Sequence, residues 1–154
     1  MRPMILAGFL LIVLGAVSLV SAQERKLERN DLPSAVQASV DRESAGATIK
    51  GFSTERENGI RTYEAEMMVD GHSKDISFDA AGNVLEIEEQ VTFDSLPASV
   101  RSSLTNLAGT GKVTKVESLT KKGRLVAYEA VIATGTKHRE VQVGPNGENL
   151  KREE

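Results

Sequence analysis

The spacing of apolar residues changes from a helical period to a strand period, and it does so twice along the chain. Leu32, Val36 and Val40 recur every four positions, which is the spacing of a stripe on one side of a helix. Between residues 60 and 69 apolar and polar side chains alternate instead, which is typical of a strand with one buried face. The same change of period returns between residues 96 and 132. The pattern predicts two successive units, each with a helix followed by strands.

The two units also resemble each other in sequence. The helix start reads LPSAV at 32–36 and LPASV at 96–100, and the strand segment YEA at 63–65 returns at 128–130. The offsets of 64 and 65 residues align similar residues at helix starts, core positions and turns. We therefore predict a tandem duplication, with a first repeat over residues 23–93 and a second repeat over residues 94–154.

Local signals indicate where the elements begin and turn. Asp31 or Ser95 can cap the helix of its unit with a side-chain oxygen. A proline follows two residues later, in the first helical turn, where its missing N–H costs nothing. Turn pairs precede the alternating strand of each unit, and an apolar spacing of three in the strand before it suggests a bulge. The turn pairs are Asn58-Gly59 and Lys122-Gly123, and the bulges are expected at 49–52 and 113–116.

These signals predict an α+β fold. Each repeat is expected to contain one helix followed by three or four antiparallel strands, with both helices on one face of the sheet. Four strands and one helix cover only one sheet face, so two units side by side can pool their strands into a wider sheet. The opposite face would then be open to water.

Strand parity predicts that this open face is acidic. The carboxylates assigned to it are Glu64, Glu66, Asp75, Glu86, Glu88, Glu129 and Glu140, with Ala127, Val131 and Ala133 as an apolar patch. Clustered carboxylates favour a cationic peptide, a basic protein surface or divalent cations. The alternative is a solvated face that keeps the protein soluble. No loop with the EF-hand pattern is present, and no metal site or cofactor is expected.

The first 22 residues have the pattern of a secretory signal. Arg2 precedes an apolar stretch of 17 residues from Met4 to Val20, and Val20-Ser21-Ala22 provides small residues for cleavage after Ala22. An uncleaved membrane anchor is the alternative, because the stretch is only slightly shorter than a membrane span. We expect a periplasmic or secreted protein with no membrane segment after cleavage.

Charge and cysteine content narrow the function classes. Without Arg2 the chain has 18 basic and 22 acidic side chains, a net charge of −4, so we expect no nucleic-acid partner. The chain has no cysteine, which excludes disulfides, thiol catalysis and cysteine metal sites. The composition leaves the oligomeric state open.

The residues that could support catalysis are few. His72 and His138 are the only histidines, and both follow a turn, where an exposed polar role is the simpler interpretation. Ser34, Ser39, Ser102 and Ser103 fall on the predicted helices and are interpreted as helix-surface residues. Neither a GxSxG motif nor a phosphate-binding loop is present. We therefore expect no enzyme.

The motifs together resemble a known family. The helix opened by LPSAV, the YEA strand and the segment DGHSKDISFDAAGNVLEIE from Asp70 to Glu88 are similar to the PepSY-like family, also described as beta-lactamase-inhibitor-like. The resemblance covers about residues 27–152 and implies an exported bacterial protein of tandem helix-and-sheet units. Two departures concern function. The disulfides of beta-lactamase inhibitory proteins are absent, and the predicted open face has no aromatic residue, so beta-lactamase inhibition is not inferred.

The sequence thus favours a non-catalytic exported binding or inhibitor-type module that acts through an open antiparallel sheet face on a protein or peptide partner with basic character. Two alternatives stay open. One is a structural or stress-related envelope protein that binds cations or basic polymers weakly, and the other is a small enzyme, which would need a deep pocket with converging titratable groups.

Overall fold

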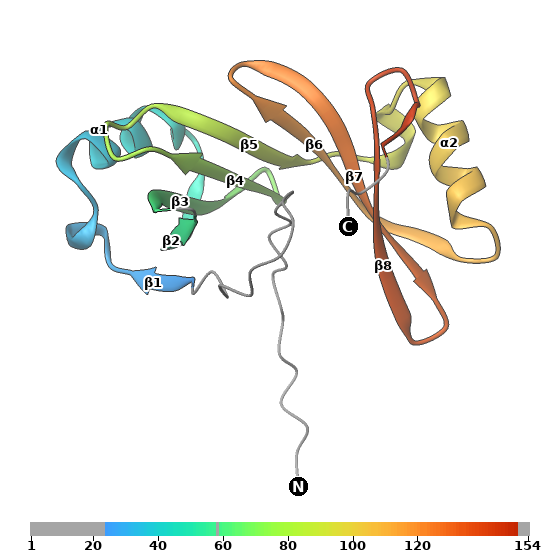
Figure 1. The fold of residues 1–154 in the computed structure, drawn as a ribbon, viewed down its shortest axis with the longest axis horizontal. Coiled ribbons are helices and arrows are strands. Elements are labelled where there is room, and N and C mark those ends of the chain that lie inside the picture. The colour runs from blue at the N-terminus through green and yellow to red at the C-terminus, as the bar shows by residue number, and fades with distance from the viewer. Residues whose placement is uncertain (1–23, 58, 151–154) are drawn as a thin grey trace, which may run out of the picture.

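A single antiparallel sheet forms most of the molecule (Figure 1). The computed structural model describes residues 24–57 and 59–150, so the predicted signal segment and its cleavage site lie outside the described residues. The nine strands of the sheet follow one another in chain order, and each pairs with the next. They are β1 (Arg25–Leu27), β2 (Thr48–Glu57), β3 (Ile60–Val69), β4 (His72–Phe78), β5 (Val84–Gln90), β6 (Lys112–Lys121), β7 (Arg124–Thr134), β8 (Lys137–Val143) and β9 (Asn149–Leu150).

Two helices accompany the sheet. α1 (Ser34–Glu43) precedes β2 and α2 (Ala98–Ala108) precedes β6, and each follows a short 3₁₀ turn, at Arg29–Asp31 and at Phe93–Ser95. The helices lie near opposite ends of the molecule in Figure 1. Among the described residues, no helix is long and apolar enough to cross a membrane.

The sheet dominates the fold more than the sequence pattern predicted. Antiparallel strands with two helices agree with the expected class, and one continuous sheet agrees with the pooling of strands that the sequence allowed. The description of the fold as two separate helix-and-strand repeats is not confirmed. β5 pairs with β6 over five residue pairs from Glu86–Lys121 to Gln90–Glu117, and this ladder makes the sheet continuous. The sequence pattern also missed β1, which pairs with β2 at the edge of the sheet.

α1 covers the first part of one sheet face. Val36 and Val40 are fully buried against a cluster that includes Tyr63, Ile76 and Phe78. The four-residue spacing places both valines on the same side of the helix, and the two-residue spacing places the strand residues on the same face. Burying each large apolar side chain in this way contributes roughly 1.5–3 kcal/mol.

α2 covers the second part of the same face. Val100 and Leu104 are fully buried against Val116, Ala130 and Val143. Cross-strand pairing places both clusters on one side of the sheet, because side chains of directly opposite residues share a face. The expectation that both helices cover one face therefore agrees with the strand register.

The helices begin differently from the sequence prediction. Asp31 and Ser95 do not cap them, because each ends the preceding 3₁₀ turn. Pro33 and Pro97 occupy the N-cap positions, with no side-chain cap. The leucine before each proline is extended, because the proline ring disfavours a helical residue before it, and this extended residue separates the predicted caps from the helix.

Two helix serines connect the helices to turns of the sheet. Ser39 is only 2% exposed, and its hydroxyl donates a hydrogen bond to the carbonyl oxygen of Gly82 at 2.6 Å. The hydroxyl of Ser103 likewise donates to the carbonyl oxygen of Gly147. The interpretation of these serines as helix-surface residues was therefore wrong. The contact is invisible to local sequence patterns because its partners are 43 and 44 residues apart.

Candidate functional site: the open face of the sheet

Three carboxylates lie directly opposite one another on three neighbouring strands. Glu66 of β3 pairs with Asp75 of β4, and Asp75 pairs with Glu88 of β5. All three belong to the face opposite the helices, because they alternate with the buried Ala65, Ile76 and their neighbours. We call Glu66, Asp75 and Glu88 the carboxylate row. Like charges placed directly opposite in a sheet repel each other.

The other acids assigned to the open face by the sequence surround this row. Glu64 and Glu86 both lie opposite Ser77. Glu129 and Glu140 lie on the same face, farther along the sheet on β7 and β8. The register therefore brings all seven predicted residues to one face.

The sequence analysis missed Glu117 of β6. Glu117 lies opposite Glu129 and is largely buried, with 13% of its side chain exposed. Strand parity could have found it, because Glu117 directly follows the buried Val116 and lies beyond the bulge that the sequence predicted at 113–116. From here the acidic face means Glu64, Glu66, Asp75, Glu86, Glu88, Glu117, Glu129 and Glu140.

Burial makes Glu64, Asp75 and Glu88 harder to ionise. Burial, followed by the charges of Glu129 and Glu86, raises the pKa of Glu88 from an ordinary 4.5 to about 8. Burial and the charge of Asp75 raise the pKa of Glu64 from 4.5 to about 7. Burial and the charge of Glu117 raise the pKa of Asp75 from 3.8 to about 6.

Glu129 shows two opposing effects on one carboxyl. Burial raises its pKa, while the hydrogen bond that the Gln142 side chain donates lowers it. The upward effect dominates. The acidic face therefore carries several carboxyls whose protonation changes near neutral pH.

Two lysines on the same face partly compensate the charge. The Lys121 ammonium lies 2.8 Å from a carboxylate oxygen of Glu86, and the Lys115 ammonium lies 2.6 Å from one of Glu117. The Ser73 hydroxyl lies 3.3 Å from the same Glu117 oxygen. The eight carboxylates of the acidic face outnumber the basic side chains on the same side of the sheet, which are Lys26, Lys112, Lys115, Lys121 and Arg124, so the face has an excess of negative charge. Among the described residues, no ion pair involves the carboxylate row.

Three carboxylates converge near the centre of the face. One oxygen of each of Asp75, Glu88 and Glu117 lies within 4.8 Å of the others. Asp75 is the most buried of them, at 9% exposure. This arrangement can hold a cation, either the ammonium or guanidinium of a side chain or a metal ion, although the sequence analysis expected no metal.

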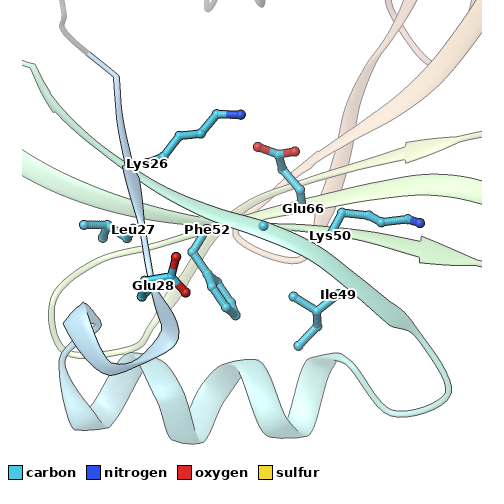
Figure 2. A pocket seen from close by; sticks show the side chains of 8 residues that line it. Lys26, Leu27, Glu28, Ile49, Lys50, Phe52 and Glu66 are labelled. Atoms are coloured by element: carbon cyan, nitrogen blue, oxygen red, sulfur yellow. The ribbon is translucent and has the colours of Figure 1, made fainter.

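A hollow of about 400 Å³ lies at the Glu66 end of the row. It lies where β1 ends beside the bulge of β2, because the backbone N–H of Glu28 donates to Asp31 instead of continuing the strand. Figure 2 shows Lys26 and Glu66 on one side of β2, and Ile49 and Phe52 on the side of α1. The lining contains neither histidine nor serine.

The predicted apolar patch is not an exposed surface. Ala127 is 2% exposed, and Val131 and Ala133 are partly buried. All three alternate with the buried Tyr128, Ala130 and Ile132, so they belong to the open face as parity predicted, but they offer little area for contact.

The two histidines do not belong to the group of converging carboxylates. His72 begins β4, His138 lies in β8, and both are exposed.

Solved structures with the same architecture are known. A BLIP-like protein from Bacteroides fragilis is 23% identical, with a TM-score of 0.60 over 78% of this chain and 84% of its own. A protein from Bacteroides eggerthii described as periplasmic is 17% identical, with a TM-score of 0.65 over 78% of this chain and 86% of its own. The fold is BLIP-like.

A protein of the DUF2874 family from Bacteroides ovatus, 17% identical with a TM-score of 0.61, covers 78% of this chain and 85% of its own. No family model matches the chain, and no curated protein matches it. The neighbours therefore support the beta-lactamase-inhibitor-like part of the expected resemblance and not PepSY specifically. At these identities the BLIP-like likeness concerns the fold alone.

Proposed function

We propose that this protein is a non-catalytic binding module that holds a basic protein or peptide against the acidic face of its sheet. The observation that carries this proposal is the carboxylate row, in which Glu66, Asp75 and Glu88 lie directly opposite one another on adjacent strands. Each such pair destabilises an isolated sheet by roughly 0.2–1 kcal/mol. When a cationic partner binds, its positive charges attract the carboxylates and offset the repulsion between them.

The position of the row supports a surface rather than a pocket as the binding device. Neither helix covers this side of the sheet, and the acidic face extends from β3 to β8. A partner with several lysines or arginines can therefore contact several carboxylates at once. Such complementarity accelerates association at low salt and is weakened by added salt.

The composition of the hollow supports a non-catalytic role. Its polar lining consists of Lys26, Glu28, Lys50 and Glu66, without a nucleophile held beside a base. Both histidines are exposed, and neither belongs to the convergent carboxylate group in the described part of the chain. These features favour binding over the small-enzyme alternative.

Export and duplication belong to the same proposal. The signal-like segment before residue 23 and a structural neighbour described as periplasmic support a periplasmic or secreted location. The sequence offsets of 64 and 65 residues support an origin by tandem duplication, with repeats at 23–93 and 94–154. In this view the second copy extends the sheet and contributes Glu117, Glu129 and Glu140 to the acidic face.

Weak cation binding is the second candidate function. It is favoured by one observation, the convergence of Asp75, Glu88 and Glu117 within 4.8 Å. Oxygen-rich groups of this kind suit calcium, whose ligands are carboxylates and carbonyls. Lys115 already places an ammonium on Glu117, so a metal ion would compete with an internal cation.

The two candidates can be separated by titration. The probe is a fluorescent octalysine peptide, with octaglutamate as the control peptide, measured by anisotropy at low and raised salt. We expect saturable, salt-sensitive binding of octalysine only, and a Glu66→Gln/Glu88→Gln variant that binds about tenfold more weakly or worse.

The matched control variant is Glu43→Gln/Asp94→Asn, which removes the same charge from α1 and from the 3₁₀ turn before α2. Equal weakening by both variants would show that net charge alone attracts the peptide and would reject the acidic face as the site. A titration with calcium tests the second candidate, weak cation binding. Binding of calcium without any octalysine signal would favour it.

A further inference from the structure

The two helix-bearing halves of the molecule have separate hydrophobic cores. One core gathers residues of α1 and β1–β4, including Val36 and Phe78, and the other gathers residues of α2 and β6–β8, including Leu104 and Val143. In the described sheet, the one strand pairing between the halves is that of β5 with β6, a junction that we call the seam. Figure 1 shows the strands of the two halves diverging on either side of it.

The helix side of the seam is polar where β6 begins to contribute to it. Ile87 of β5 packs against the first core and lies opposite Thr120, and Glu89 lies opposite Ser118. The Ser118 hydroxyl donates a hydrogen bond to the backbone oxygen of Glu89 at 3.3 Å. On the open side, Leu119 is 5% exposed and lies opposite Glu88. Neither core cluster spans the junction, and a junction without a continuous core resists bending less than a packed core does.

The open side of the seam brings carboxylates of the two halves together. Asp75 and Glu88 come from the first half, and Glu117 and Glu129 come from the second. Oxygens of Asp75, Glu88 and Glu117 approach within 4.8 Å across the seam. When these groups are charged, they repel each other across the junction and favour a wider angle between the halves.

We propose that the seam is a pH-sensitive hinge, in which the charge on Asp75, Glu88, Glu117 and Glu129 sets the angle between the two halves. At acid pH the protonated carboxyls allow the open face to close. As the pH rises, ionisation drives the halves apart on that face. The hinge does not depend on the proposed binding function, because it requires no partner.

Asp75 and Glu88 change their protonation in the range in which such a hinge would act. Burial and neighbouring charges raise the pKa of Asp75 to about 6 and that of Glu88 to about 8. Mutual repulsion contributes to both, since Glu117 acts on Asp75 and on Glu88, and Glu129 acts on Glu88. The change of angle is therefore expected between about pH 6 and pH 8.

Other charged groups on the same face modify the response. Lys115 forms an ion pair with Glu117, and Lys121 forms one with Glu86, so both lysines reduce the repulsion between carboxylates at the edges of the seam. The polar neighbours of Glu117 and Glu129 are Ser73 and Gln142. The remaining charged or titratable groups on this side of the sheet are Lys26, Glu55, Glu64, Glu66, Lys112, Arg124, His138 and Glu140, from β1, β2, β3, β6, β7 and β8.

Energy transfer between dyes on the two halves tests the hinge. The chain has no cysteine, so Arg61→Cys on β3 and Lys137→Cys on β8 give two unique, exposed labelling sites. We expect the transfer efficiency to change through one transition between pH 6 and pH 8, toward greater separation at high pH. Circular dichroism checks that the protein stays folded over this range.

The decisive variant is Glu88→Gln/Glu117→Gln in the same labelled chain, which keeps the side-chain size and removes two charges from the seam. Its pH-dependent change in efficiency should be at least twofold smaller, while Glu43→Gln/Asp94→Asn should leave the change intact. Raised salt should shrink the change in the unsubstituted labelled protein, which tests the hinge even if the glutamine variant does not fold. A constant efficiency across this range, or a full change in the glutamine variant, would overturn the proposal.

Discussion

The same strands form both faces of the sheet, but one face is apolar and covered by the helices, whereas the other is charged and open. On the helix-covered face, Phe78 and Ile76 are fully buried among apolar neighbours. On the open face, their chain neighbours include Asp75, which is almost as buried but is surrounded by other carboxylates. One residue step along β4 therefore separates a position that stabilises the fold from one that opposes it. Strand alternation allows the protein to place stability on one face and charge on the other.

This comparison predicts where substitutions will be costly and where they will not. Positions on the helix side should lose stability when they are truncated. Positions on the open side should gain stability when a charge is removed, because the repulsion disappears. Four changes test this contrast, from the largest expected effect to the smallest.

Phe78→Ala should cause the largest loss. The side chain is fully buried beneath α1, so its removal leaves a cavity and should lower the free energy of unfolding by about 3–5 kcal/mol. Urea denaturation followed by circular dichroism measures this value. Ile60→Ala, at a side chain that is 66% exposed, is the control and should change stability by about 0.5 kcal/mol or less. Similar losses in both variants would contradict the assignment of the core.

Gly82→Ala should have the next largest effect. Gly82 has a φ of +79°, and an added Cβ would lie 2.5 Å from the backbone oxygen of Ala35 in α1. Left-handed strain and this clash together should lower the free energy of unfolding by about 2–3 kcal/mol. Gly71→Ala is the matched control, because Gly71 has a φ of +84° with nothing within 4 Å of the added atom. It should cost about 1 kcal/mol, and an equal cost at both positions would refute the close contact with α1.

The pH dependence of stability probes the open face as a whole. Glu64, Asp75 and Glu88 have folded-state pKa values raised to about 7, 6 and 8, so the folded protein binds more protons than the unfolded chain. Their stabilising contribution is complete below an unfolded pKa of about 4 and is lost as the pH rises to about 8. We expect the free energy of unfolding to fall by about 2 kcal/mol over this interval. Urea titrations at several pH values that show constant or rising stability would contradict the crowding of these acids.

Glu88→Gln should produce the smallest change, with the opposite sign to the core variants. Removing one charge from the carboxylate row should raise the free energy of unfolding by about 1 kcal/mol at pH 8. Near pH 4 the wild-type carboxyl is protonated, because its pKa is about 8, so the variant and the wild type should be equally stable there. Equal gains at both pH values would point to packing rather than charge as the cause.

The sequence predicted the elements whose residues repeat with a clear period. The spacing of Val36 and Val40 predicted the buried side of α1, and alternation from Tyr63 to Met67 predicted the inward face of β3. The bulges in β2 and β6 were also predicted, at 49–52 and 113–116. These features depend on neighbours within one or two turns of chain, so a local pattern records them.

Features that depend on distant contacts were missed. β1 contains two charged residues among three and exists as a strand only through its pairing with β2. The burial of Ser39 depends on a turn 43 residues away. The open side of the seam likewise depends on register between strands, which the sequence pattern alone does not specify.

The central claim is that the open face of the sheet is the surface through which the protein binds. Mapping the backbone amide resonances during a titration with octalysine at pH 8 tests it most directly. The account predicts saturable shifts along β3 to β7, largest near Glu66, Asp75 and Glu88, with α1 and α2 unchanged. Shifts confined to the helices, spread evenly over the surface or absent at low salt would contradict it.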